Sequence, residues 1–378
     1  MIYFDHSATT PMDERALDVL KEANVKMYGN SNSLHDVGGL AAQLIENSRR
    51  RIARLLNVPN HRIFFTNSGT ESNVLAIVQI ALTSCTKEII ISKGEHASCD
   101  SAVDYLARHG YTIHSVPFRT DGIIDMDILE KKMNENIGMM IVQHVNPELG
   151  TIQPIEQIAK IAKKYDALIH CDLVQSFGKI DISPIIPYID SASVSSHKVG
   201  GPIGVGAVYI REHVRFEPLF QGFPVEGGFR GGTLDAPSIA SFATAATFAI
   251  EEREDFKKQA NALHKQLIDQ LKRTIPAHHL TIYGENTIPH IIGLGIYPIE
   301  GQLLMLRLNE KGFAISTGSA CQVGMQVASK AMYAIDASPD RAKEFVRISF
   351  GKSTTVKDVK ALAETIHSIY TEHVTMVK

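Results

Sequence analysis

Short apolar segments alternate with longer amphipathic segments through much of this chain. The apolar segments lie at 62–66, 88–92, 111–118, 138–145, 167–172, 191–196 and 204–210. Between them, apolar residues recur at helical spacing at 71–84, 99–110, 125–136 and 155–166. Strands separated by crossover helices form a parallel sheet that is covered on both faces. The pattern therefore predicts an α/β fold of this kind, with its ligand bound beyond the carboxyl ends of the strands.

A long helical segment at 237–275 leads away from this region. Beyond it, apolar segments alternate with helical ones, the apolar segments being 280–284, 290–296, 313–317 and 345–351. A chain of 378 residues is too long for one ordinary core. We therefore predict a large domain over 15–255 and a smaller α+β domain formed by 256–378 together with 1–14.

Composition adds limits to this picture. The chain is 44% apolar and 21% charged, and its net charge of −3 comes without any block of like charges. No apolar run approaches a membrane span, and the opening residues lack the basic segment of a secretory signal. The four cysteines show no metal-ligand spacing. We therefore expect a cytoplasmic globular protein with reduced thiols, no metal site and no direct contact with nucleic acid.

Two turns after predicted strands carry candidate binding groups. In "TNSGTES" (66–72), the backbone N–H groups of Gly69 and Thr70 could hold a phosphate at the start of a helix. A capping box explains the same residues without any ligand. Asp172 ends another predicted strand, with Gln175 three residues on. The acid could pair with a protonated ring nitrogen or simply cap the next turn, and both interpretations stay open.

Lys198 lies in "SSHKVGG" (195–201), between a Ser-Ser-His run and two glycines. A lysine beside cationic or apolar groups can lose its proton and form a Schiff base with a carbonyl. The glycines would let a cofactor approach closely. For the isolated motif, a solvated loop lysine is the more common case.

Three further side chains are candidates for chemistry. Cys321 follows a predicted strand in a small-residue turn, where a thiol can be exposed and reactive. Cys85 and Cys171 fit the role of small, inert hydrophobic residues better. Arg347 lies within an apolar alternation and needs a partner, either a substrate carboxylate or a structural acid. His96 could stack on a planar ring or move a proton, although a single histidine is more often structural.

The ordered set of motifs resembles the cysteine desulfurases of the NifS/IscS group. These are fold-type I enzymes of the class V aminotransferase family, which depend on pyridoxal 5'-phosphate (PLP). The motifs run in order over nearly the whole chain, and they are "YFDHSATTP", "GNSNSLH", "FTNSGTES", "GEHAS", "HVNPELG", "HCDLVQSFGK", "SSHKVGGPIGVGAVYIR", "RGGTLD", "STGSAC" and "VRISFG". A set of this size is far more specific than any one of its members.

This resemblance implies how the chain would bind PLP. Lys198 would hold it covalently, Asp172 would pair with the pyridine nitrogen, and Gln175 would pair with the phenolic oxygen. His96 would stack on the ring and take part in acid–base steps. The phosphate would be bound by Gly69, Thr70, Ser195 and His197, and by Thr233 of the partner subunit. A contact of that last kind implies a homodimer.

The implied activity is the removal of sulfur from L-cysteine to give L-alanine and a persulfide on Cys321. Arg347 would bind the carboxylate of the substrate. A sulfur-acceptor protein would then take the sulfur toward iron–sulfur cluster assembly, tRNA thiolation or DNA phosphorothioation. Another class V PLP enzyme such as a selenocysteine lyase, or a sulfur-relay scaffold of low activity, remains an alternative.

The chain departs from the family pattern at three places near the implied site. One is "QVAS" (326–329) after Cys321, where "LEPS" is usual. Pro147 stands where a second asparagine is usual, and Gly227, in "GFPVEGG" (222–228), stands where an arginine is common. Proline has neither a side-chain donor nor a backbone N–H. We expect a hydrogen bond to cofactor or substrate to be lost or supplied by another group, with a specialised acceptor or weaker activity as the result.

Overall fold

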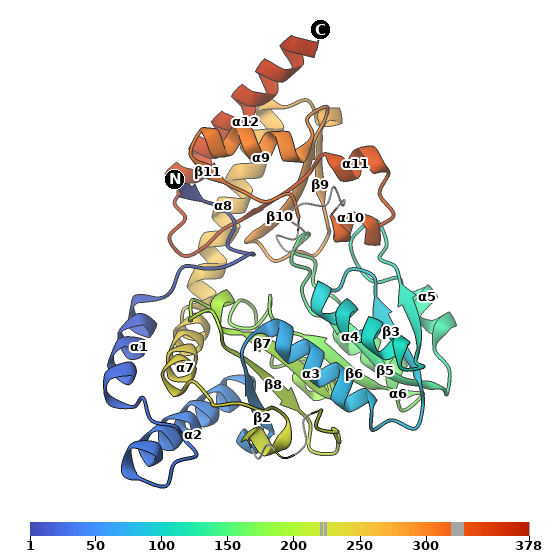
Figure 1. Cartoon of the computed structure of the whole chain (residues 1–378). Helices are drawn as coiled ribbons and strands as arrows, with labels where there is room; N and C mark the ends of the chain where they lie inside the picture. The colour runs from blue at the N-terminus through green and yellow to red at the C-terminus, as the bar shows by residue number, and fades with distance from the viewer. Residues whose placement is uncertain (220–221, 223–224, 319–328, 378) are drawn as a thin grey trace.

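A computed structural model describes residues 1–219, 222, 225–318 and 329–377 (Figure 1). Its largest sheet has seven strands in the order β2-β8-β7-β6-β5-β3-β4. Their bounds are β2 Ile63–Thr66, β3 Glu88–Ser92, β4 Thr112–Val116, β5 Ile137–Gln143, β6 Leu168–Asp172, β7 Ser191–Ser195 and β8 Gly206–Ile210. Strand β8 runs antiparallel to both neighbours, whereas β7, β6, β5, β3 and β4 pair in parallel. The predicted α/β fold with a mainly parallel sheet is confirmed.

Helices cover this sheet, as Figure 1 shows. The four that lie between strands overlap the segments predicted from helical spacing, and they are α3 Gly69–Ala81, α4 Ala97–Arg108, α5 Met126–Lys132 and α6 Ile155–Lys163. Two more helices, α1 Glu14–Lys26 and α2 Asp36–Leu56, each pack against α7 Ala236–Glu251. Among the described helices, none combines the length and the apolar character that crossing a membrane requires.

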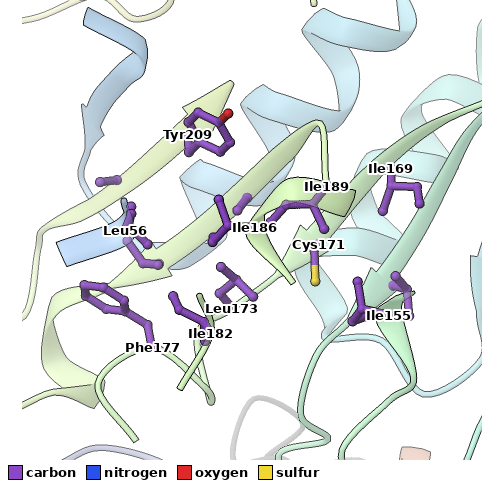
Figure 2. Packing of buried hydrophobic residues seen from close by; sticks show 14 of the residues in the cluster. Leu56, Ile155, Ile169, Cys171, Leu173, Phe177, Ile182, Ile186, Ile189 and Tyr209 are labelled. Carbon is purple, nitrogen blue, oxygen red and sulfur yellow. The ribbon is translucent and has the colours of Figure 1, made fainter. Parts of the chain in front are cut away.

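The core beside β6 and β7 is built from aliphatic and aromatic side chains. Figure 2 shows Cys171 of β6 close to Leu173 and Ile189, all of which are buried. Both strands are buried almost throughout, although β6 has polar residues toward its end and serines alternate with apolar residues in β7. The packing holds the carboxyl ends of β6 and β7 in place, where the candidate site residues begin.

A second core lies around a three-stranded antiparallel sheet, β12-β10-β9, with a two-stranded parallel sheet, β1-β11, beside it. The strands are β1 Ile2–Tyr3, β9 Leu280–Tyr283, β10 Ile291–Ile296, β11 Phe313–Ala314 and β12 Phe345–Ser349. The helices are α8 Arg253–Thr274, α9 Gly301–Glu310, α10 Lys330–Ala334, α11 Pro339–Lys343 and α12 Val356–Val377. Phe4 is fully buried in this core, so the N-terminal segment joins the C-terminal region. The exact division near residue 255 remains a prediction.

The long helical segment predicted at 237–275 is in fact two helices. The break falls at Glu252, between α7 and α8, where the backbone leaves helical geometry. Figure 1 shows α8 running from the large sheet toward the second core. Helical spacing continues across the break, and for that reason the sequence pattern did not reveal it.

A buried ion pair ties α2 to the turn at Val225–Gly228. Arg49 donates to both carboxylate oxygens of Glu226, at 2.6 and 2.8 Å, and the backbone N–H of Phe65 donates to the same carboxylate at 2.6 Å. The Glu226 side chain is 1% exposed. Its removal would leave Nη2 of the buried Arg49 and the Phe65 N–H without their acceptor, which is far more costly than the loss of an exposed pair.

We expect Glu226→Ala to lower the free energy of unfolding by about 3–5 kcal/mol, as measured by urea denaturation. Glu46→Ala is the matched control, because Glu46 pairs with the same Arg49 at 2.8 Å but its side chain is half exposed. The control should change stability by about 1 kcal/mol or less. Equal effects of the two substitutions would contradict the role assigned to Glu226.

Candidate active site

The carboxyl ends of β2, β6 and β7 lie at one edge of the large sheet, since these strands point in the same direction. Asp172 ends β6, Ser195 ends β7, and Lys198 follows in the short 3-10 helix Ser196–Lys198. Strand β2 leads through a turn into α3, which begins at Gly69. Four of the candidates named from the sequence are therefore gathered at this edge.

The amine of Lys198 is held by the N-terminal segment. Its Nζ donates to the carbonyl oxygens of Ser7 at 2.6 Å and Ala8 at 2.5 Å. The same segment bonds the preceding residue, since the Thr10 N–H donates to the His197 carbonyl at 3.1 Å. Lys198 is thus a partly buried lysine with defined partners, and the solvated loop lysine considered from the isolated motif is wrong.

Asp172 is a buried carboxylate with fixed orientation. It is 7% exposed, its Oδ2 accepts from Asn73 Nδ2 at 2.8 Å, and its Oδ1 accepts from the Val174 N–H at 2.8 Å. Asp172 therefore does cap the turn that follows β6, as one of the two interpretations predicted, and it also accepts a hydrogen bond from the side chain of Asn73. Gln175, three residues on, donates to the Ser7 carbonyl at 2.9 Å, which places it beside the segment that also holds Lys198.

The start of α3 has the features of an anion cradle. Ser68 Oγ caps the helix by accepting from the Glu71 N–H at 3.0 Å, and the Glu71 carboxylate accepts in return from the N–H of Asn67, one residue before the cap, so the turn closely resembles a capping box. A Cβ added at Gly69 would lie 3.1 Å from Ser195 Cβ, which shows how closely the turn approaches β7. Ser195 is 2% exposed, and its Oγ finds no hydrogen-bond partner within the described part of the chain. A buried hydroxyl without a partner beside a helix N-terminus fits a bound anion.

Two histidines lie close to Lys198. Burial is the main cause that lowers the pKa of His96, and the nearby Lys198 and Lys330 lower it further while Asp172 opposes them. Burial, with Lys198 and His96 as lesser causes, lowers the pKa of His197 to about 4. Both rings are therefore neutral at pH 7. His96 caps α4, because its Nδ1 accepts from the Ser98 N–H at 3.1 Å.

Arg347 reaches the same site from β12. Its Nη2 forms an ion pair with Asp5, its Nη1 donates to the Pro147 carbonyl at 3.2 Å, and the side chain is 3% exposed. Within the described residues, its Nε has no hydrogen-bond partner although it is buried. The structural acid considered from the sequence is present as Asp5, and binding of a substrate carboxylate by Arg347 remains a prediction.

Pro147 contributes through its carbonyl oxygen. That oxygen accepts from Ser7 Oγ at 2.7 Å and from Arg347. Pro147, although it differs from the family pattern, therefore connects the N-terminal segment with β12. The neighbouring Asn146 turns inward, with its Oδ1 accepting from the N–H groups of Glu148 and Leu149 at 2.9 and 2.8 Å. The loop after β5 is thus held by its own hydrogen bonds.

Two of the proposed residues cannot be placed in a site by these contacts. Thr233 is exposed on the single chain, and its contact with a partner subunit remains a prediction. Cys321 lies outside the described residues. Of the other cysteines, Cys99 and Cys171 are buried, and burial raises the pKa of both thiols. Cys85 is exposed, so its interpretation as a buried hydrophobic residue is wrong.

The sequence reasoning missed several residues that hold the site together, among them Ser7, Asn73, Glu95 and Ser98. Asn73 had a detectable signal, since it is a polar residue on a helix whose other buried positions are mostly apolar. Ser7 and Glu95 lie in motifs of the family resemblance, but nothing local distinguishes them. Their partners come from other elements of the fold.

Glu95 is a buried acid that keeps its proton. It is 1% exposed, its Oε1 accepts from Ser92 Oγ and from the Gln143 N–H, and Lys330 donates to its backbone carbonyl. Burial raises the pKa of Glu95 from 4.5 to about 8. The carboxyl therefore links β3 and β5 as a neutral group below that pH.

We expect this proton to make stability depend on pH. The unfolded chain releases it near pH 4.5 and the folded protein near pH 8, so stability falls as pH rises between these values. The slope is about −1.4 kcal/mol per pH unit. Glu95→Gln, a neutral isostere, removes this contribution. Urea unfolding of both proteins across the window should show the variant gaining stability over wild type as pH rises, and a constant difference would contradict the assignment.

Comparisons with known proteins agree with this geometry. The family model described as aminotransferase class-V matches residues 2–362. A relative from Bacillus subtilis (strain 168) that carries the name NifS is 38% identical over 372 residues, covering 97% of this chain and 93% of the relative. The cysteine desulfurase IscS of Dictyoglomus turgidum (strain DSM 6724 / Z-1310) is 32% identical, with coverage of 97% and 94%.

Solved structures give the same result. A NifS-like protein superposes with a TM-score of 0.90 at 31% sequence identity, covering 98% of this chain and 99% of its own. The similarity thus extends over both cores and the edge of the sheet where the candidate residues lie.

Proposed function

This chain belongs to the aminotransferase class-V family, and on that premise we propose that it is a cysteine desulfurase. The reaction removes sulfur from L-cysteine and leaves L-alanine. The observation that carries the proposal is the position of Lys198 at the sheet edge, with its amine held by two carbonyls of the N-terminal segment near Asp172 and His96. Relatives over nearly the full chain support it, since they carry the names NifS and IscS.

The residues at this edge fit PLP as cofactor. Lys198 would bind it covalently, Asp172 would face its ring nitrogen, and Gln175 and His96 would contact the ring. Its phosphate would be bound by Gly69, Thr70, His197 and the buried Ser195 Oγ, which has no partner among the residues that the structure describes. Thr233 of the partner subunit would complete that site in a homodimer. When bound, PLP withdraws electrons from the Cα of an amino acid.

The side chains of this protein would divide the remaining work. Arg347 binds the substrate carboxylate through its Nε edge, which orients Cα toward Lys198. Lys198 and the neutral His96 move protons to and from the substrate carbon. The thiolate of Cys321 attacks the substrate sulfur, so that an S–S bond forms as the C–S bond breaks. The electron pair and a proton go to the carbon, which becomes the methyl group of alanine.

The persulfide on Cys321 would pass to a sulfur-acceptor protein. Iron–sulfur cluster assembly, tRNA thiolation and DNA phosphorothioation are the candidate destinations, and the expected setting is the cytoplasm. A solved structure described as "SspA in complex with cysteine" is similar to this chain, with a TM-score of 0.81, 29% identity and coverage of 93% and 99%. The molecule bound to that protein is the substrate that we propose here.

The proposal is tested by turnover of L-cysteine with purified protein and added PLP. We expect alanine and sulfide in equal amounts when a thiol reductant is present, and Cys321→Ala should lower sulfide release by about 100-fold or more. Cys99→Ala is the control, because that thiol is buried and its pKa is raised. Sulfide release by Cys321→Ala at the wild-type rate would exclude the persulfide, and the absence of a yellow chromophore would favour a scaffold.

A further inference from the structure

A chain of buried polar groups runs behind the active site from β7 to α3. Ser191 Oγ lies 2.8 Å from His170 Nδ1, and His170 Nε2 lies 3.0 Å from Asn73 Oδ1. The amide nitrogen of Asn73 then donates to Asp172 Oδ2 at 2.8 Å. Ser191, His170 and Asn73 are each at most 1% exposed, so water does not compete for these bonds.

The direction of these hydrogen bonds follows from the chemistry of the groups. The Asp172 carboxylate only accepts, so the Asn73 NH₂ must face it and Asn73 Oδ1 must face His170. His170 therefore donates from Nε2, and its Nδ1 accepts from the Ser191 hydroxyl. Burial lowers the pKa of His170 to about 3, which keeps the ring neutral as this arrangement requires.

A second branch leads from the same amide to His96. Asn73 Nδ2 lies 2.9 Å from Ser98 Oγ, and Ser98 Oγ lies 2.8 Å from His96 Nδ1. The Ser98 N–H can only donate, and it too points at His96 Nδ1. Nδ1 must therefore accept, so the Ser98 hydroxyl donates to it and accepts from Asn73. The neutral His96 ring consequently carries its proton on Nε2.

We propose that Asn73 is a positioning residue that couples Asp172 to His96 by donating one amide hydrogen toward each. One hydrogen holds the carboxylate of Asp172, and the other directs the Ser98 hydroxyl onto His96, so that the proton available for chemistry lies on His96 Nε2. The catalytic meaning of this coupling rests on the proposed function. The hydrogen-bond directions do not, because they follow from the side chains of the chain alone.

The direct test is the ¹⁵N spectrum of the histidine rings in the purified protein, with the signal of His96 assigned from His96→Gln. Wild type should show His96 with a protonated Nε2 and an unprotonated, hydrogen-bonded Nδ1. A protonated Nδ1 would overturn the proposal even if the protein turns over cysteine. The expected tautomer in a protein without desulfurase activity would instead leave the coupling intact and reject the proposed function.

Two variants separate the branches. Asn73→Leu has a similarly branched side chain but no donor, so kcat should fall by about 10- to 100-fold, and the acid limb of its pH profile should move to higher pH. Ser98→Ala should shift the His96 ring signals and leave the acid limb where it is in wild type, because the donor to Asp172 remains. The coupling is wrong if Asn73→Leu leaves both the acid limb and the His96 signals unchanged while its thermal unfolding matches wild type.

A variant that changes only charge guards against a purely structural explanation. Asn73→Asp keeps the shape but places a second carboxylate against Asp172, so it should lower kcat at least as much as Asn73→Leu. Recovery at low pH, where the new acid can bind a proton and donate, is the expected signature. Wild-type activity of Asn73→Asp at neutral pH would overturn the assignment.

Discussion

Replacement of Lys198 with alanine is expected to lower the turnover of L-cysteine by at least about 1,000-fold, because the substitution removes both the covalent anchor and a proton-transfer group. The carbonyls of Ser7 and Ala8 position the amine at the edge of the sheet, close to the other site residues. The measurement is steady-state production of alanine together with the visible spectrum of the protein with PLP. The variant should bind PLP without the absorption of the lysine adduct.

The sharpest control for this prediction is Lys179→Met. Lys179 lines the same cavity of about 450 Å³ as Lys198, and burial lowers the pKa of Lys179 to about 8. A choice made from basicity alone would therefore favour Lys179 as the nucleophile. We expect Lys179→Met to keep the chromophore and the activity, and added methylamine to restore part of the activity of Lys198→Ala. Loss of the chromophore in Lys179→Met but not in Lys198→Ala would reverse the assignment.

Arg347→Lys is expected to raise the dissociation constant of amino acids by about 10- to 100-fold. Lysine keeps the positive charge but cannot offer the two parallel donors that a carboxylate accepts. Lysine also keeps a cation beside Asp5. Alanine would leave that acid unpaired, so a loss of affinity could then come from a less stable protein instead of from weaker carboxylate binding. Spectral titration of the PLP-loaded protein with L-alanine measures the effect.

Ethylamine separates carboxylate recognition from general damage, because it differs from L-alanine only in lacking the carboxylate. Its dissociation constant should be the same for wild type and Arg347→Lys. Arg341→Lys is the matched protein control, since Arg341 lies in the same region but is exposed and bonds Glu344 and Thr281. Equal weakening of L-alanine and ethylamine would show that Arg347 acts on the fold and not on the carboxylate.

The sequence alone determined the class of fold and most of its elements. Strands β3 and β5 fall where the apolar runs predicted them, because strands buried on both faces are mostly apolar. It also placed Asp172 at the end of a strand and Lys198 two residues beyond the apolar segment 191–196, whereas Ser195 was named only through the family resemblance. Residues that follow parallel strands meet at one edge of the sheet. The sequence could therefore predict that these residues lie near one another, but not which atoms are in contact.

The tertiary structure decided which partners these residues have. Ser7 and Asp5 come from the N-terminal segment and meet Lys198 and Arg347 from regions nearly two hundred or more residues away, and no periodicity encodes such contacts. The same is true of Asn73, whose amide finds Asp172 only because α3 packs beside β6 and β7. Local pattern depends on the burial of each face, whereas hydrogen-bond partners depend on how distant elements are packed. For that reason, the sequence could identify the groups that react, and only the fold could show what holds and orients them.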